Sequence, residues 1–220
     1  MNEVHWATND NACLIDAVKK IGSNVLVTFV PEEWKSVMIG QNFCEYGILR
    51  EYWIEDLKCI EISGIPYFKL QKEEYGEASD VTIDCRWQSR EFHGESPKWV
   101  SRWMGNGDPD ANAIGARDCS ILVHRENSRV VGIVCVAIYG DMSKNGAILW
   151  IREIAVMPEF QGQGIGRKLI QNALAYGNQY GAKKVFLMAD DCNTTAVHLY
   201  KSIGFIPNEE EAQIDMIYMK

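Results

Sequence analysis

A glycine-rich loop between a strand-like segment and a helix-like segment constrains this chain most strongly. Apolar residues dominate Ala147 to Val156, which predicts a buried strand, and Pro158 then turns the chain. The loop Gln161-Gly-Gln-Gly-Ile-Gly166 leads into a predicted helix that ends at Gly181. Glycines expose successive backbone N–H groups, and the positive end of a helix adds to them. The pattern therefore predicts either an anion-binding cradle or a strand–helix junction whose glycines serve packing alone.

Two other kinds of anion-binding loop fit these residues less well. A Walker A loop needs Ser or Thr after Gly-Lys, whereas Gly166 is followed by Arg-Lys-Leu. A dinucleotide fingerprint needs G-x-G-x-x-G with an acidic residue about 20 positions later, where Lys183 and Lys184 stand instead. A nucleotide-binding switch or a dehydrogenase is therefore the disfavoured interpretation.

Strand and helix patterns alternate through the second half of the chain, which predicts a mixed sheet with helices on its faces. Alternation over 81–87 predicts a half-buried strand, and Ser96-Pro97 predicts the start of a helix. That helix carries Trp99 and Trp103. Both are expected in the core, and the alternative is that they form a lid over a bound substrate. Further strands are expected at 120–124, 130–139, 147–156, 185–188 and 214–218, and a second helix at 194–203.

A polar stretch at 72–80 marks the predicted boundary between two domains, residues 1–78 and 79–220. In the first domain, 43–57 is expected to be helical in part, and 60–70 to form two short strands. Asp10 or Asn11 is expected to cap a short helix that buries Leu14, Ala17, Val18 and Ile21. This N-terminal α+β extension carries no chemistry that the sequence identifies.

A second motif follows the predicted strand at 185–188. It reads Asn193-Thr-Thr-Ala-Val-His-Leu-Tyr-Lys-Ser-Ile-Gly-Phe205. Together with Gln161-x-x-Gly164-x-Gly166, this block resembles the GCN5-related N-acetyltransferase (GNAT) superfamily over about residues 80 to 220. Each motif alone is common, but the two in this order, separated by one helix and one strand, are specific. The resemblance implies an α+β (α/β-like) fold whose mixed central sheet is splayed open between 149–156 and 185–188, with flanking helices.

The resemblance also implies a cofactor, acetyl-coenzyme A (acetyl-CoA), and the residues that bind it. The loop would grip the pyrophosphate, and the cofactor arm would pair like an extra strand with the end of the preceding strand. Gln161 stands where the family often has arginine, which shifts anion binding further onto backbone donors. The expected cofactor-binding residues are Ile154, Ala155, Val156, Gln161, Gly162, Gln163, Gly164, Ile165, Gly166, Arg167 and Asn193.

Acetyl transfer needs a base, because a primary amine is protonated at neutral pH and must lose a proton before it attacks. The expected base is Glu153, acting directly or through water; its alternative role is an ion pair with Arg152 or a lysine. By family analogy Tyr200 donates a proton to the departing thiolate, the alternative being a tyrosine packed against the sheet. His198 stands two residues from Tyr200 and therefore faces another way. Further acids that either ring the acceptor end or are solvated are Asp84, Glu91, Glu95, Asp108 and Asp110.

Charge and composition limit the classes of molecule that this chain is expected to bind. The chain has 22 basic and 30 acidic residues, a net charge of −8, which disfavours nucleic acid and anionic lipid and mildly favours a cationic small molecule. Apolar runs stay below the roughly 18 residues of a membrane span, the N-terminus lacks a secretory pattern, and seven scattered cysteines show no zinc spacing.

We therefore predict a cytoplasmic acetyl-CoA-dependent N-acetyltransferase, without a metal, that acts on a small cationic amine by direct attack in a ternary complex. Nucleic acid and membranes are not expected as partners. Protein or peptide N-acetylation and a non-catalytic acyl-CoA-binding module are the alternatives. The acceptor, the role of 1–78 and the oligomeric state, including a homodimer, stay open.

Overall fold

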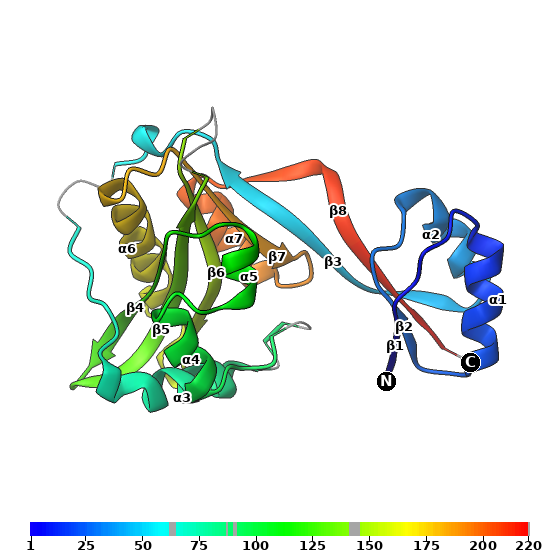
Figure 1. The fold of residues 1–220 in the computed structure, drawn as a ribbon, viewed down its shortest axis with the longest axis horizontal. Coiled ribbons are helices and arrows are strands. Elements are labelled where there is room, and N and C mark those ends of the chain that lie inside the picture. Colours follow the sequence, from blue (N-terminus) through cyan, green and yellow to red (C-terminus); the bar gives the residue numbers. More distant parts are fainter. Residues whose placement is uncertain (62–64, 87, 90–91, 141–145, 220) are drawn as a thin grey trace. The chain divides into compact units, whose positions relative to one another are not determined.

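The computed structural model describes residues 1–61, 65–86, 88–89, 92–140 and 146–219 (Figure 1). The chain forms two compact units. The first comprises Met1–Glu51, Ala189–Thr194 and Asn208–Lys220, and the second comprises Tyr52–Met188 and Thr195–Pro207. The predicted domain boundary between residues 78 and 79 stays a prediction, because compactness alone does not delimit a homologous domain.

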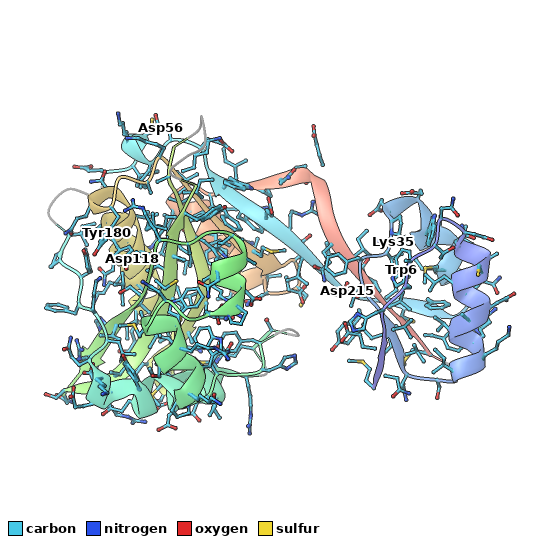
Figure 2. The ribbon with its side chains drawn as sticks, viewed as in Figure 1. Trp6, Lys35, Asp56, Asp118, Tyr180 and Asp215 are labelled. Atoms are coloured by element: carbon cyan, nitrogen blue, oxygen red, sulfur yellow. The ribbon has the colours of Figure 1, made fainter. Side chains whose placement is uncertain are left out.

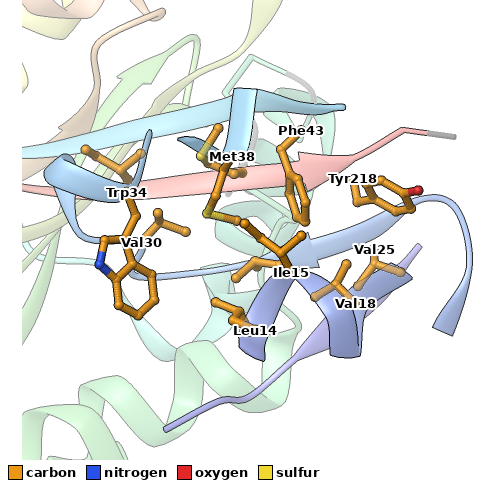
Figure 3. Close-up of a cluster of buried hydrophobic side chains, with 12 residues drawn as sticks. Leu14, Ile15, Val18, Val25, Val30, Trp34, Met38, Phe43 and Tyr218 are labelled. Atoms are coloured by element: carbon orange, nitrogen blue, oxygen red, sulfur yellow. The ribbon is translucent and has the colours of Figure 1, made fainter. Parts of the chain in front are cut away.

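The first unit is a small α+β unit. Its strand order is β1-β2-β8-β3, with β1 parallel to β2 and β2 antiparallel to β8. Its elements are β1 (Asn2–Val4), α1 (Asn11–Ile21), β2 (Val25–Val27), α2 (Glu32–Ile39), most of β3 (Phe43–Ile54) and most of β8 (Ile206–Tyr218). Side chains from both helices and three strands form its core (Figure 3).

The predicted helix cap in this unit is confirmed at Asp10, whose Oδ1 accepts a hydrogen bond from the Ala12 N–H at 2.9 Å. Leu14 and Val18 are buried as expected, and Ile15 joins them. The predictions for Ala17 and Ile21 are wrong, since both are exposed. The helix buries a narrower face than its apolar residues indicate, because only one side of it meets the sheet.

The second unit contains the mixed sheet that the sequence predicts. Its strand order is β3-β7-β6-β5-β4; β4, β5 and β6 pair antiparallel, and β6 pairs with β7 in parallel. The strands are β4 (Asp118–Glu126), β5 (Arg129–Tyr139), β6 (Ile148–Val156) and β7 (Lys184–Asp190). The helices are α3 (Tyr75–Cys85), α4 (Pro97–Met104), α5 (Pro109–Ala113), α6 (Ile165–Gln179) and α7 (Thr194–Ile203), with 3₁₀ turns η1 (Leu57–Cys59), η2 (Lys72–Glu74) and η3 (Pro158–Phe160).

Helices cover both faces of this sheet. In Figure 1, α4 and α5 lie in front of the strands and α6 lies behind them. The predicted start of α4 is confirmed, because the Ser96 hydroxyl accepts from the Trp99 N–H at 3.2 Å and Pro97 takes the first helical position. Trp99 and Trp103 are buried, as the core-packing prediction has it.

The C-terminal end of α6 is tied to neighbouring backbone and side chains. The Tyr176 hydroxyl hydrogen-bonds the Asp118 carboxylate on β4, and the Arg117 guanidinium donates to the Tyr180 carbonyl at 2.6 Å. Asp118 and Tyr180 are labelled in Figure 2. This end of the helix is therefore held by structural contacts.

Three secondary-structure predictions are corrected. Residues 43–57, expected to be helical in part, form strand β3 and turn η1, as suits a segment rich in Tyr, Trp and Ile. The predicted strand at 81–87 is the end of helix α3, and residue 87 lies outside the described residues. In the described part of 60–70, the two predicted strands reduce to one isolated bridge between Lys69 and Leu122; residues 62–64 are not described.

Candidate active site

The sheet opens where β6 and β7 stop pairing. Their parallel register runs from Ile148 opposite Lys184 to Ile151 opposite Leu187 and goes no further. β6 continues to Val156 and stays paired with β5, where Val156 lies opposite Gly132. The segment from Arg152 to Val156 therefore has a strand neighbour on one side only, so its other edge offers backbone groups to an extended ligand. This is the splayed sheet that the family resemblance implies.

A β-bulge begins this unpaired segment. Glu153 lies opposite Cys135 and Ile151 lies opposite Val136, which leaves Arg152 as the extra residue. Because two consecutive residues then oppose one, Arg152 and Glu153 no longer alternate strictly between the two faces. The Arg152 Nη1 atom lies 3.4 Å from Glu153 Oε1.

The glycine-rich loop presents an open backbone surface. Gly162 and Gly164 have φ of +74° and +79°, and a Cβ added to either would meet no atom within 4 Å. Gly166 differs, since its added Cβ would lie 3.3 Å from Leu199 of α7. The first two glycines therefore leave room for a ligand, whereas the third permits close packing of α6 against α7.

The start of α6 has unused hydrogen-bond donors. Gly164 precedes the helix in a left-handed conformation, and no side chain caps it. Among the described residues, none accepts a hydrogen bond from the backbone N–H groups of 162–167. Donors of this kind, at the positive end of a helix of 15 residues, form a site for a phosphate group. The loop residues thus fit the pyrophosphate of acetyl-CoA.

Side chains in the loop have partners within the protein. The Gln161 amide donates to the Val156 carbonyl at 2.8 Å, and the Arg167 guanidinium donates to the Ser202 hydroxyl at 2.6 Å. The Val156 carbonyl also accepts from the Cys85 thiol at 3.1 Å. The Gln161 and Arg167 side chains are thus engaged within the protein. That anion binding at this loop relies on backbone N–H groups stays a prediction.

Glu153 lies in an environment that suits a base near neutral pH. Its side chain is 20% exposed. Burial raises its pKa to about 7, against the lowering influence of the Arg152 guanidinium, and Glu95 adds a further raising influence. A carboxylate with a pKa near the working pH is matched to taking a proton from an ammonium group.

Tyr200 is buried on α7 at 5% exposure, with Tyr52 and Phe205 as its ring neighbours at 6.2 and 6.1 Å between centroids. Burial raises the pKa of its hydroxyl, and the charge of Glu153 raises it further. That influence means that the two groups are electrostatically coupled. The hydroxyl stays protonated at neutral pH and hydrogen-bonds none of the described residues.

Arg152 lies at the centre of a cluster of carboxylates and tryptophan rings that the sequence did not predict. Its guanidinium contacts Glu95 and Asp110, each at 3.3 Å, as well as Glu153. Its central carbon lies 4.8 Å from the ring centroid of Trp99 and 5.6 Å from that of Trp103. The tryptophans are therefore core residues that also make cation–π contacts, with an arginine of the chain. Glu95 is 57 positions from Arg152, and sequence spacing carries no signal for such a contact.

The remaining candidate residues differ in burial and in hydrogen bonding. Asp108 is a buried helix cap, whose Oδ1 accepts from the N–H groups of Asp110 and Ala111. Asp84 and His198 are exposed, and Glu91 lies outside the described residues. Asn193 directly precedes α7 and belongs to the first unit, so its contact with the cofactor stays a prediction.

Among the helices that the structure describes, none combines the length and the apolar composition that a membrane span requires.

Comparison with known proteins bears on the same part of the chain. The model of the acetyltransferase (GNAT) family matches residues 82–205. An uncharacterized N-acetyltransferase of Methanocaldococcus jannaschii is 30% identical over 113 residues, which are 51% of this chain and 46% of that protein. The mycothiol acetyltransferase of Rhodococcus opacus is 26% identical over 129 residues, 59% of this chain and 41% of that protein. The matched region thus spans less than half of either relative.

The solved structure of a GCN5-related N-acetyltransferase from Sphaerobacter thermophilus shares the fold. It superposes with a TM-score of 0.60 at 15% identity, covering 88% of this chain and 58% of that chain. Both motifs, the splayed sheet and the family match lie within the same segment. This chain therefore belongs to the acetyltransferase (GNAT) family.

Proposed function

We propose that this chain transfers the acetyl group of acetyl-CoA to a small cationic amine by direct attack in a ternary complex. The observation that carries the proposal is the unpaired half of β6, which bears Glu153 and runs through η3 into a loop of open backbone donors. A binding edge, an anion cradle and a base of suitable pKa therefore follow one another along a short stretch of chain.

The cradle at 162–167 would hold the pyrophosphate, and the free edge of Arg152–Val156 would align the cofactor arm. One helix terminus stabilises a charge by only about 0.3–2 kcal/mol, so several N–H groups must act together. Bound acetyl-CoA supplies an activated thioester carbonyl. The open space at Gly162 and Gly164 supports this assignment, because a side chain at either position would occupy the approach to the donors.

The protein residues would manage the protons. Glu153 takes a proton from the ammonium group of the acceptor, directly or through water, at its carboxylate oxygen. As the nitrogen–carbon bond forms and the carbon–sulfur bond breaks, Tyr200 would give the proton of its hydroxyl to the departing sulfur. It would regain a proton from the attacking nitrogen, which loses its second proton on becoming an amide. An ordinary carboxylate, with a pKa of about 4.3, binds a proton too weakly to be an effective base at neutral pH. Burial raises the pKa of Glu153 to about 7, which supports its role as the base.

The acceptor class follows from charge. The chain carries a net charge of −8, and Glu95 and Asp110 lie beside Arg152 close to the proposed base. Acidic surroundings favour the approach of a cationic amine. The relative from Rhodococcus opacus is named for a small molecule, mycothiol, which supports a small molecule over a protein substrate.

The cofactor assignment can be tested by calorimetry with acetyl-CoA on a matched pair of variants. Gly164 and Gly181 lie at opposite ends of α6, with φ of +79° and +78°, and in both cases an added Cβ meets nothing within 4 Å. Alanine causes the same backbone strain at each site, about 1–3 kcal/mol. We expect Gly164→Ala to weaken acetyl-CoA binding at least tenfold and Gly181→Ala to leave it unchanged. Equal affinities in the two variants would contradict the cradle.

Turnover is tested by screening an amine panel for thiol release from acetyl-CoA. Polyamines, aminoglycosides, amino acids and peptides cover the acceptor classes. Release with a cationic small amine supports the proposal. Binding of acetyl-CoA without release for any acceptor would contradict it and indicate an acyl-CoA-binding module.

A further inference from the structure

One guanidinium nitrogen of Arg152 contacts two carboxylates. Its Nη1 lies 3.3 Å from Glu95 Oε1 and 3.4 Å from Glu153 Oε1, while Nη2 lies 3.3 Å from Asp110 Oδ2. The two carboxylates on Nη1 are 23% and 20% exposed, and the arginine is 18% exposed. In such partly buried surroundings, charges interact more strongly than they do at a surface.

The guanidinium has little freedom to move away. Trp99 and Trp103 stack on each other, with 5.3 Å between ring centroids, and both lie within cation–π distance of Arg152. Trp103 is anchored in turn by a hydrogen bond of 3.1 Å from its indole N–H to the Ser120 carbonyl. The bulge in β6 sets the backbone position of Arg152. The cation is therefore held in place by the core.

We infer that Arg152 and Glu95 are positioning residues for Glu153. The Glu95 and Glu153 carboxylates share one guanidinium nitrogen of Arg152, and Arg152 and Glu95 act in opposite directions on the charge of Glu153. Arg152 favours the ionised form of Glu153. Glu95 disfavours it twice, by its own negative charge and by taking a share of the guanidinium. This inference rests on the proposed function for the role of Glu153 as base, but its effect on the carboxylate does not require turnover.

Other groups around Glu153 do not supply a substitute cation. Tyr200 of α7 and Cys135 of β5 are coupled to its charge, and burial raises the pKa of both, which keeps them neutral. Asp110 of α5 reaches the site through Arg152, and Asp108 and Arg102 act on Glu95. Among the described residues, Arg152 is the one basic side chain that contacts the carboxylate.

The inference is tested by two titrations of the intact protein. The first follows kcat/KM against pH, and the second follows the side-chain carboxyl carbon of Glu153 by NMR, assigned with Glu153→Gln. We expect Glu95→Gln to lower the midpoint of the acid limb and of the carboxyl titration by about one pH unit, and Arg152→Gln to raise both by about one.

Two further variants serve as controls. Asp110 is 67% exposed, so Asp110→Asn is expected to shift the midpoint less than Glu95→Gln does. Arg152→Lys keeps the charge and is expected to return the midpoint most of the way to the wild-type value, although a lysine lacks the planar fork. If Arg152→Gln fails to fold, Glu95→Gln and Arg152→Lys decide the matter.

Opposite shifts in the two neutral variants support the inference. No shift in Glu95→Gln, or shifts of the same sign in both variants, would overturn it. If the wild-type protein released no thiol with any amine, the proposed function would fail, and the carboxyl titration would still decide whether Arg152 and Glu95 act on Glu153.

Discussion

The two halves of strand β6 differ in how their backbone is paired and, on our proposal, in their role. From Ile148 to Ile151 the strand is paired on both sides, with β5 and β7, and Leu149 packs completely buried beneath α6. From Arg152 to Val156 it is paired with β5 only, and it carries a bulge and two charged side chains. The first half joins the sheet together; the second half leaves an edge and places a carboxylate beside it. Backbone pairing, more than residue type, separates the structural half of the strand from the half that we propose as the cofactor-binding edge.

The largest expected effect concerns the unpaired half. Replacing Glu153 by Gln removes the proposed base while keeping its size, and should lower kcat/KM by about 10²–10⁴-fold. The acid limb of the pH profile, expected near pH 7 in the wild type because activity needs the ionised carboxylate, should disappear. Acetyl-CoA affinity should change little. A normal rate in this variant would show that the base lies elsewhere.

A second contrast is in stability. Leu149→Ala in the paired half should lower the free energy of unfolding by about 2–5 kcal/mol, because a fully buried leucine contacts α6. Ile154→Ala, at a partly exposed position of the unpaired half, should cost only about 1 kcal/mol. Urea denaturation measures both. Equal losses would mean that the two halves are packed alike.

The third expected effect is a gain in stability. The folded-state pKa of Glu153 is raised to about 7, above the ordinary value of about 4.3. Between these values the native state holds a proton that the unfolded chain has lost, so the free energy of unfolding falls as pH rises through this window.

Because Gln never ionises, Glu153→Gln should match the wild type near pH 4 and exceed it by about 1–3 kcal/mol at pH 8. Denaturation curves at the two pH values measure the difference. A variant less stable than the wild type at pH 8 would contradict the view that the ionised carboxylate costs stability.

Much of the second unit could be predicted from the sequence, because its signals are local. Ser96-Pro97 marks a helix start, and the apolar runs at 130–139 and 147–156 mark buried strands. The two motifs identify the family.

The features that the sequence did not predict depend on tertiary context. Alternation over 81–87 favoured a strand, yet Ala78, Val81, Thr82 and Cys85 also follow helical spacing, and packing against β5 and β6 selects the helix. The bulge at Arg152 depends on register across two strands. The contact between Glu95 and Arg152 joins segments 57 positions apart, which periodicity cannot detect.

The most direct measurement is the change in backbone amide NMR signals when coenzyme A is added. The amides of Gly162–Arg167 and of Arg152–Val156 should shift, while those of Ile148–Ile151 should keep their positions. If the loop amides do not move at saturating coenzyme A, or if the paired half of β6 responds as strongly as the unpaired half, the proposed cofactor site is wrong.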